Sequence, residues 1–437
     1  MGEYIAEKAK SLSGTGYNPD PRSPNTIGSV TPGVRGNGLF QSVSGGISEN
    51  VLVSGLVFGR YTFDDKYTLT GSFRSDGSSK LPIDTRWQQF FSVGAIWDLG
   101  KEDFIKNISQ VNMLRLKGSY GSSGNANNFP GGDYPYQALY ATGTYDGSNT
   151  LFPTTPGNPL AKWEFTYTAN VGLDFELLNR RVWGDVNWYN KTTKDLFIQR
   201  KLSATAGFGI GDFISQNAGE LVNKGWEVTL NGEVLRKNNL SVVLFGNFAY
   251  NKNRVTSLAG EPAYEQGTEL INVGFPLGTH YEVEWAGVDA STGRPLYVDA
   301  NGDLTLTPTD NDRVQKFGTW EAPWKGGFGT RVKYKGFDLD VLFSWQDGAT
   351  KVDNMEYFME NPVGFLSGGY NQSSDLKFWQ QPGDIVSTPS PLYSTAFSSK
   401  IIHDASFVRL RDVTLSYRLP KNVLGNAVLT PAANTKA

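Results

Sequence analysis

The chain has 437 residues, a formal net charge of −3 and only 19% charged residues, so it lacks the basic surface of a nucleic-acid-binding protein and the charge run of an acidic tail. It contains no cysteine, which excludes thiol catalysis, disulfide bonds and cysteine-ligated zinc sites. Its 50 glycines, 20 tyrosines, 11 tryptophans and 26 phenylalanines combine turn formers with strand formers, and favour one large β structure.

The sequence shows neither a membrane-spanning helix nor a signal peptide. No apolar run approaches the roughly 20 residues that a membrane helix requires, and residues 1–14 lack the apolar core of a signal peptide. The mean hydropathy of −0.36 is usual for a soluble protein. A transmembrane β-barrel escapes that inference, because only alternate residues of each strand touch lipid.

Along the chain, three regions differ in pattern. Residues 1–46 are predicted to be irregular, since the stretch from Gly14 to Gly46 is rich in Gly, Ser, Asn and Pro and shows no period. Residues 47–420 are predicted to form the partial barrel. Residues 421–437 are predicted to be an irregular tail.

The middle region repeats one pattern, an alternating strand followed by a turn. Between Tyr167 and Glu176 one face is apolar while the other carries polar or small residues, and residues 240–251 and 337–346 behave likewise. A period of two sustained over about ten residues indicates strands long enough to cross a bilayer. About eleven such strands are predicted, near residues 50–62, 67–76, 87–98, 113–122, 163–176, 181–192, 222–235, 240–252, 324–334, 337–346 and 407–419.

The alternation also predicts which way side chains face. Apolar residues should contact lipid and polar residues should point into a lumen. The lipid-facing examples are Leu173, Val228, Leu244 and Val341, and the lumen-facing examples are Asp174, Glu227 and Asp340.

The connections between strands alternate between short and long, as in outer-membrane barrels, where the short turns are periplasmic. The short ones are 63–66, 177–180, 236–239 and 335–336, and the long ones are 123–162, 193–221, 253–323 and 347–406. The connection at 100–112 is an exception on the short side, where residues 102–108 are predicted to hold a helical turn. The fold class predicted is therefore all-β, a transmembrane antiparallel up-and-down barrel.

Several motifs, in this order, resemble the SusC/RagA-like TonB-dependent transporters of Bacteroidetes, over about residues 45–420. They are Tyr61-Thr-Phe-Asp-Asp-Lys-Tyr67 with Arg74-Ser-Asp-Gly-Ser-Ser79, Leu114-Arg-Leu-Lys-Gly-Ser-Tyr-Gly-Ser-Ser-Gly-Asn125, Asn158-Pro-Leu-Ala-Lys-Trp-Glu164, Asn223-Lys-Gly-Trp-Glu227, Ala286-Gly-Val-Asp289 with Gly293 and Pro295-Leu-Tyr297, Phe378-Trp-Gln-Gln-Pro-Gly-Asp384, and Ser406-Phe-Val-Arg-Leu-Arg-Asp-Val-Thr-Leu-Ser-Tyr417.

The resemblance implies a barrel of about 22 strands with a plug in its lumen. It implies import of a glycan or peptide, a SusD-like surface lipoprotein as partner, surrounding outer-membrane lipids, and energy from the TonB complex. A signal peptide, a TonB box and a plug are expected to precede this region in the family, and the tail from Gly425 does not match the family's closing strands. The chain is therefore expected to be an incomplete barrel that contacts TonB through a missing N-terminal part.

Candidate solute-contacting residues follow from the lumen prediction and from loop aromatics, since carboxylates and amides bond hydroxyl groups and aromatic faces stack on sugar rings. The candidates are Asp174, Asp185, Asn187, Glu227, Trp320 and Trp379. The alternative for each is a structural role, such as holding a plug or packing a loop.

Catalytic and metal sites receive little support. The two histidines, His280 and His403, lie outside the strands, and no enzymatic activity and no cofactor are expected. Asp299, Asn301 and Asp303 have the spacing that begins a calcium loop, but the later positions of that motif are absent. A hairpin turn between residues 295–298 and 304–306 is favoured instead.

The sequence thus predicts TonB-dependent uptake of an oligomeric nutrient across the outer membrane. Two alternatives stay open at this point: an outer-membrane adhesion barrel with long surface loops, and a soluble all-β glycan-binding module.

Overall fold

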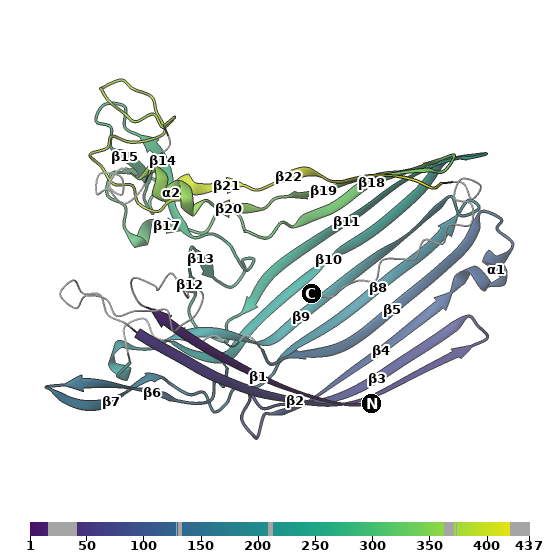
Figure 1. Ribbon diagram of the computed structural model, residues 1–437, viewed down its shortest axis with the longest axis horizontal. Helices are drawn as coiled ribbons and strands as arrows, with labels where there is room; N and C mark the ends of the chain where they lie inside the picture. Colours follow the sequence, from purple (N-terminus) through teal and green to yellow (C-terminus); the bar gives the residue numbers. More distant parts are fainter. Residues whose placement is uncertain are drawn as a thin grey trace, which may run out of the picture.

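The computed structural model describes residues 1–15, 42–127, 129, 133–208, 213–361, 371–372 and 374–419. Its main element is a curved antiparallel sheet of twelve strands, shown in Figure 1, in the order β1-β2-β3-β4-β5-β8-β9-β10-β11-β18-β19-β22. Their bounds are β1 Gly2–Thr15, β2 Ser42–Phe63, β3 Tyr67–Ser78, β4 Trp87–Asp98, β5 Val111–Asn125, β8 Glu164–Leu177, β9 Val182–Lys201, β10 Phe213–Lys237, β11 Leu240–Ser257, β18 Trp324–Tyr334, β19 Phe337–Asp347 and β22 Phe407–Tyr417.

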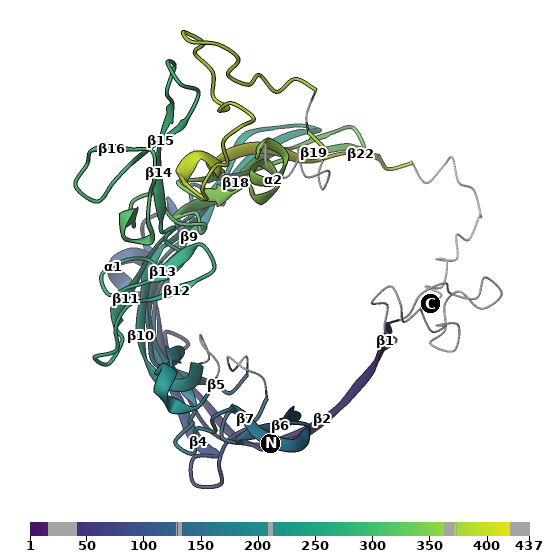
Figure 2. The ribbon, with the colours of Figure 1, turned by 90° about the vertical axis from the view of Figure 1, so that its left-hand side faces the viewer.

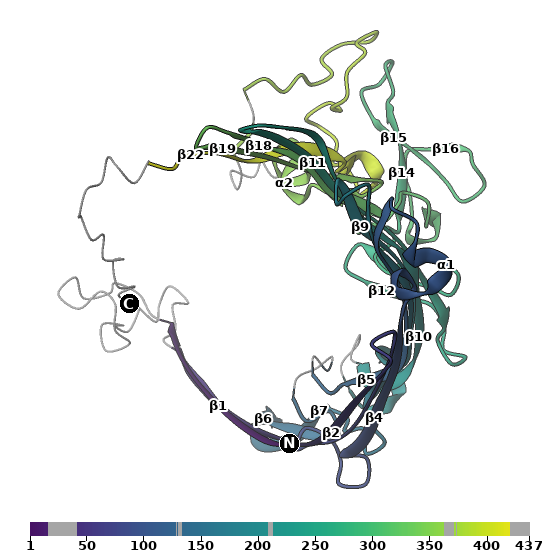
Figure 3. The same ribbon diagram turned by 90° about the vertical axis from the view of Figure 1, so that its right-hand side faces the viewer.

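The sheet curves into an open arc. Figures 2 and 3, which look along the strands from opposite sides, show β1 at one edge of the arc and β22 at the other. Each strand pairs with its neighbours in the order given, and the described parts of β1 and β22 do not pair with each other. The arrangement is that of a barrel wall, in which successive hairpins lie side by side.

The register separates two faces of this wall. One row of directly paired residues crosses five strands and is apolar throughout: Trp97, Leu116, Leu173, Val186 and Val228. Since neighbours along a strand point to opposite sides, the adjacent row belongs to the other face. That row is Asp98, Arg115, Asp174, Asp185 and Thr229. We call these the apolar face and the polar face, and the separation predicted from the alternation is confirmed.

All eleven predicted strands are present in the wall, but a twelfth was missed. Residues 1–46 were predicted to be irregular, yet β1 spans Gly2–Thr15 and β2 already begins at Ser42. The β1 sequence does not alternate cleanly, because lysine and leucine share one side of it and isoleucine and glutamate the other. Backbone pairing with β2 along its whole length defines the strand instead. The tail at 421–437 lies outside the described residues.

The two ends of the wall differ, as the connection lengths predict. Figure 1 shows the hairpin turns gathered at one end, the turn end, and the longer connections at the other, the loop end. The turns are tight: Asp64 and Asp65 both have φ of 50°, and Leu178, Asn179 and Arg180 are also left-handed. The predicted helical turn at this end is α1, Asp103–Lys106, preceded by the 3-10 helix η3, Leu99–Lys101.

The loop end carries small elements of its own. The strands β14, β15, β16 and β17 form a four-stranded sheet, which we call the loop sheet. The bounds are β6 Leu139–Tyr145, β7 Ser148–Thr155, β12 Tyr264–Gln266, β13 Glu269–Ile271, β14 Glu282–Val288, β15 Pro295–Val298, β16 Leu304–Thr305, β17 Arg313–Val314, β20 Thr350–Val352, β21 Ile402–Asp404, α2 Asn354–Glu360, η4 Ala204–Ala206, η5 Asp310–Asp312 and η6 Ser399–Ile401.

Compact cores form where the wall meets the loops. One cluster is built from buried Leu81, Phe90, Trp163 and Phe197 with Ala161, and we call it the junction core. A second cluster of aliphatic residues lies between the loop ends of β9, β10 and β11. Among the described residues, no helix has the length and apolar character needed to traverse a bilayer.

Candidate functional site

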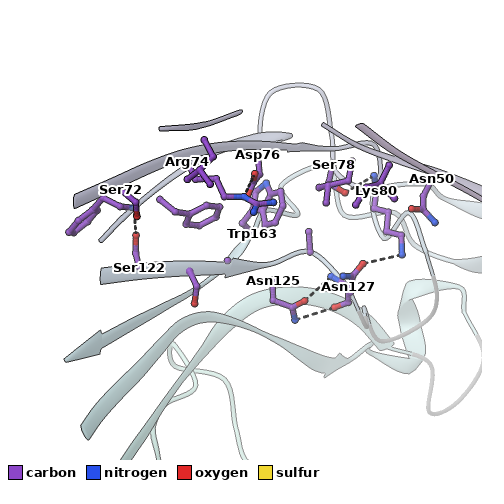
Figure 4. Close-up of a pocket in the computed structure, with 18 of the residues that line it drawn as sticks. Asn50, Ser72, Arg74, Asp76, Ser78, Lys80, Ser122, Asn125, Asn127 and Trp163 are labelled. Atoms are coloured by element: carbon purple, nitrogen blue, oxygen red, sulfur yellow. Dashed lines mark hydrogen bonds and ion pairs between the residues drawn. The ribbon is translucent and has the colours of Figure 1, made fainter. Parts of the chain in front are cut away.

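A well-formed hollow on the polar face lies at the loop end of β1 to β5. It is a cavity of about 540 Å³, and Figure 4 shows the side chains that line it. Ser72, Arg74, Asp76 and Ser78 all come from β3, because alternate residues of a strand point to the same side. Trp163 enters from the start of β8, so the cavity is assembled from hairpins far apart in sequence.

The charged side chains of the cavity are paired. Arg74 Nε lies 2.6 Å from Asp76 Oδ1 and 2.8 Å from Oδ2, and its Nη2 donates to Ser54 Oγ at 3.0 Å. Glu3 of β1 adds a second carboxylate 3.7 Å from the same guanidinium. The guanidinium therefore has its charge balanced before any solute arrives.

Lys80 and two asparagines also line the cavity. Lys80 Nζ donates to Asn127 Oδ1 at 3.2 Å and lies 2.9 Å from Asp133. Asn125 donates to Glu164 Oε2 at 2.8 Å and accepts from the Asn127 backbone at 3.1 Å. Figure 4 shows Asn125 and Asn127 across the hollow from Arg74, with Lys80 reaching toward Asn127 from the side of Arg74.

The junction core supports the cavity from beneath. Phe90 and Trp163 pack edge to face with ring centroids 5.7 Å apart, and Trp163 Nε1 donates to the Arg86 carbonyl at 2.9 Å. Gly124 is required here, since a Cβ at this position would lie 2.1 Å from the Phe90 ring. These packed rings hold the loop end of β4 and β5 in a fixed position.

The cavity thus offers amides, hydroxyl groups and paired charges next to packed rings. Such a surface can hydrogen-bond an uncharged polar solute, while its charged groups already have partners. Within the described ranges, no group of three or more His, Asp or Glu side chains is placed to hold a metal ion.

Four of the predicted solute-contacting residues lie together on the polar face, lower on the wall. Asp174 is paired across the strands with Asp185, and Asn187 with Glu227. Lys117 donates to Asp174, and Asn187 donates to Asp185. The structure therefore brings these four residues into one polar patch, and whether they contact a solute stays a prediction.

The two predicted tryptophans are engaged within the loops. Trp379 donates from Nε1 to the Ala290 carbonyl at 2.9 Å and its ring covers Gly293, where a Cβ would lie 2.4 Å away. The Trp320 ring lies against Gly278 and under the Lys351 ammonium. Both residues have a packing role, and a role in solute contact remains a prediction.

The weak calcium candidate has the geometry of a turn. The Asp299 carboxylate accepts hydrogen bonds from the backbone of Asn301 and Asp303, each at 2.9 Å. Tyr297 pairs with Thr305 on the two sides of this turn, which confirms the hairpin between β15 and β16.

One loop carboxylate has an altered acidity. Glu282 of β14 is only 4% exposed, and its Oε2 makes no hydrogen bond with the described residues. Burial raises the pKa of Glu282 to about 7, partly opposed by the charge of Arg313. This group titrates near neutral pH, well away from the cavity on the polar face.

Sequence reasoning missed the cavity, although the signal was present. Three of the motifs that carried the family resemblance converge on it: the segment that begins at Arg74, the one that ends at Asn125, and the one that contains Trp163. Their proximity depends on hairpin pairing between β3, β4, β5 and β8. A register for those four strands would have placed the three motifs together.

Comparisons with known proteins extend over nearly the whole chain. Residues 4–430 match the family described as TonB dependent receptor-like, beta-barrel. TonB-dependent receptor P39 of Formosa agariphila is 29% identical over 420 residues, covering 83% of this chain and 39% of that protein. TonB-dependent receptor SusC of Bacteroides thetaiotaomicron is 28% identical over 397 residues, covering 85% of this chain and 38% of that protein.

Solved structures give the same result. The RagAB peptide transporter superposes with a TM-score of 0.82 at 27% identity, covering 98% of this chain and 47% of that chain. This chain therefore spans less than half the length of the relatives that it matches. The predicted resemblance to SusC/RagA-like proteins and the predicted all-β barrel fold are confirmed, and the chain belongs to the TonB dependent receptor-like family of outer-membrane β-barrels.

Proposed function

We propose that this chain supplies part of the wall of a TonB-dependent importer, which carries an oligomeric nutrient across the outer membrane. The observation that carries the proposal is the continuous polar face of the wall with its cavity at the loop end. With the apolar face in lipid, the polar face lines a lumen and the cavity lies beside its outer entrance. Membership of an outer-membrane family leaves no support for the soluble glycan-binding module.

Orientation follows from the same assignment. The turns around Asp64, Asn179 and Asn238 are periplasmic, and the loop end faces the exterior. A SusD-like lipoprotein binds over the loop end, and TonB supplies the energy. The relatives named SusC and RagAB support a transporter of this two-component type.

The cavity favours an uncharged polar oligomer, such as a neutral glycan, over a charged peptide. Arg74 and Lys80 are each neutralised by a carboxylate, so neither attracts a free acidic group strongly. The asparagine amides and serine hydroxyls remain as hydrogen-bonding groups of the kind that bind sugar hydroxyls.

Uptake by cells that produce the whole protein with its lipoprotein tests the proposal. Ser92 lines the cavity, and its hydroxyl forms a hydrogen bond with Ser72 Oγ at 2.7 Å and with no charged group, so Ser92→Trp fills the hollow while leaving the charged pairs intact. Ser344 lies on the same face in β19, outside the cavity, and Ser344→Trp is the matched control.

Uptake of a fluorescent neutral oligosaccharide should fall with Ser92→Trp, should persist with Ser344→Trp, and should stop when TonB is deleted. Equal uptake by both variants would show that the solute does not pass through the cavity. Uptake that continues without TonB would contradict the transport mechanism itself. A charged peptide taken up in preference to the oligosaccharide would overturn the assignment of the solute class.

A further inference from the structure

The connection between β4 and β5 exposes apolar side chains at the turn end of the wall. Phe104 of α1 is 65% exposed, and Ile108 just beyond the helix is also exposed. Asn107, which follows α1, keeps a right-handed helical conformation. A backbone hydrogen bond from Ile108 N to the Ile105 carbonyl at 2.8 Å continues the turn beyond α1, so Phe104 and Ile108 lie about one turn apart, and we call these two exposed residues the apolar edge.

Hydrogen bonds fix this segment to the wall. Glu102 Oε1 accepts from Tyr67 Oη at 2.6 Å and from Trp97 Nε1 at 2.9 Å. Lys101 Nζ donates to the Asp65 carbonyl in the adjacent turn at 2.7 Å. The segment is therefore held in one position relative to β3 and β4.

The residues that hold it belong to the apolar face. Tyr67 is paired with Trp97, and Trp97 begins the apolar row that continues through Leu116. Glu102 thus reaches the side of the wall that contacts lipid. Figures 2 and 3 show α1 on the convex side of the arc, in agreement with this position.

The same aromatic residues mark the level of the membrane boundary. The Phe63 and Tyr67 rings are tilted against each other with centroids 6.5 Å apart, and the Tyr67 and Trp97 rings are stacked with centroids 6.2 Å apart. Aromatic rings with a polar tip favour the headgroup layer, with the ring body toward the acyl chains. The tips of Tyr67 and Trp97 point to Glu102, so α1 lies at the level of the headgroups.

We propose that residues 103–108 form an interfacial anchor that binds the periplasmic leaflet of the outer membrane. Phe104 and Ile108 rest at the boundary between headgroups and acyl chains, continuous with the lipid-contacting apolar face. Lys106, exposed at the end of α1, lies on the headgroup side and faces lipid phosphates. The edge thereby gains an apolar environment at the membrane surface.

These 437 residues contain no cysteine, so a single cysteine introduced here can be labelled once any cysteine elsewhere in the whole protein is replaced by serine. The whole protein is folded into vesicles of phosphatidylethanolamine and phosphatidylglycerol, with an environment-sensitive fluorophore on Phe104→Cys. Leu116→Cys on the apolar face is the lipid control, and Asp146→Cys at the tip between β6 and β7 is the aqueous control. Heat-modifiable mobility on gels selects folded protein for each variant.

Quenching by nitroxide lipids then locates each label, together with quenching by iodide present both inside and outside the vesicles, because the turn end and the loop end lie on opposite sides of the membrane. The label at Phe104→Cys should be quenched by a nitroxide near the headgroup and protected from iodide. The label at Leu116→Cys should be quenched by a nitroxide deep in the acyl chain, and the label at Asp146→Cys by iodide alone. Iodide quenching at Phe104→Cys equal to that at Asp146→Cys would overturn the proposal.

A second variant tests the edge as a unit. Ile108→Asp, combined with the label at Phe104→Cys, should abolish quenching by the shallow nitroxide while the label at Leu116→Cys keeps its deep quenching. Persistent shallow quenching in that variant would overturn the proposal that the two residues anchor together. Protection from iodide without any nitroxide quenching would indicate that a protein covers the edge, and would also overturn it.

Discussion

The wall and the loop sheet are both antiparallel, but they bury their apolar side chains in different ways. On the wall, apolar residues such as Val171 and Leu230 remain half exposed within the protein, and the membrane supplies their apolar surroundings. In the loop sheet, Tyr297 is buried against Trp285 and accepts a hydrogen bond at its hydroxyl from the Ala396 backbone at 2.8 Å. The stability of the wall therefore depends on lipid on one face and water on the other, whereas the stability of the loop sheet depends on contacts between particular side chains.

The junction core should show the largest effect, because there the wall depends on specific packing as the loops do. Trp163 is 4% exposed, and Trp163→Ala should lower the free energy of unfolding by about 3–5 kcal/mol, the usual cost of removing a buried aromatic side chain. Urea unfolding of the folded protein in vesicles measures the loss. Trp320→Ala, at a half-exposed loop ring, is the control and should lower the free energy of unfolding much less. Equal losses would show that packing in the junction core contributes no more than packing in the loops.

A charge on the apolar face tests the other side of the comparison. Leu244 is 51% exposed on that face, and Leu244→Arg should cost about 2–4 kcal/mol because the guanidinium enters hydrocarbon. Asn247→Arg, three residues along β11 on the polar face, should cost far less. The yield of folded protein compares them. Equal yields would mean that the apolar face does not contact lipid.

The loop sheet should respond to pH more than the wall does. Burial raises the folded-state pKa of Glu282 to about 7, so the folded sheet holds a proton that the unfolded chain releases. Stability from this group is therefore greatest in acid, falls as the pH rises toward about 7, and is level above that value.

Hydrogen exchange at the backbone amides of β14, corrected for intrinsic rates, measures this dependence. Protection should be greater near pH 5 than near pH 8. Glu282→Gln should remove the difference and leave the amides of β11 unchanged. Protection in the wild-type protein that does not vary with pH would refute the assignment.

The smallest effect is expected for ion pairs on the polar face. Arg331 Nε lies 2.7 Å from Asp340 Oδ1, and both side chains are partly exposed to water. Asp340→Asn should change the free energy of unfolding by only about 0.2–1 kcal/mol, since water screens such pairs. A loss of unfolding free energy as large as that of Leu244→Arg would mean that water does not screen charges on the polar face.

The same contrast explains how much the sequence could predict. The wall was predictable because lipid and lumen impose a period of two on every strand, and because its hairpins pair neighbours in sequence. The strand β1 was not predicted, because its apolar and polar side chains do not alternate. The loop sheet escaped because Tyr297 meets Ala396 across 99 residues, a contact that no local pattern encodes.

The candidate site was predictable only in part. The polar patch around Asp174 followed from alternation within single strands, and register then placed Asp185 beside it. The cavity needed Arg74, Asn125 and Trp163 together, and these come from β3, β5 and the residue before β8, whose relative register the sequence does not state. Alternation identifies which face a residue lies on, but not which distant residue it meets there.

The charge pairs of the polar face also have an electrical consequence. Arg115 lies beside Asp98, Lys117 beside Asp174 and Lys333 beside Asp338, each pair on neighbouring strands. Where such pairs line a lumen, they provide polar groups but little net potential, because the two charges of each pair cancel close by. Ions of either sign would meet similar barriers along this part of the wall, so its conductance would discriminate weakly between potassium and chloride. Any selection of solutes by charge would then depend on the loops and on a partner bound over them. The wall itself would line a hydrated lumen with little selectivity for charge.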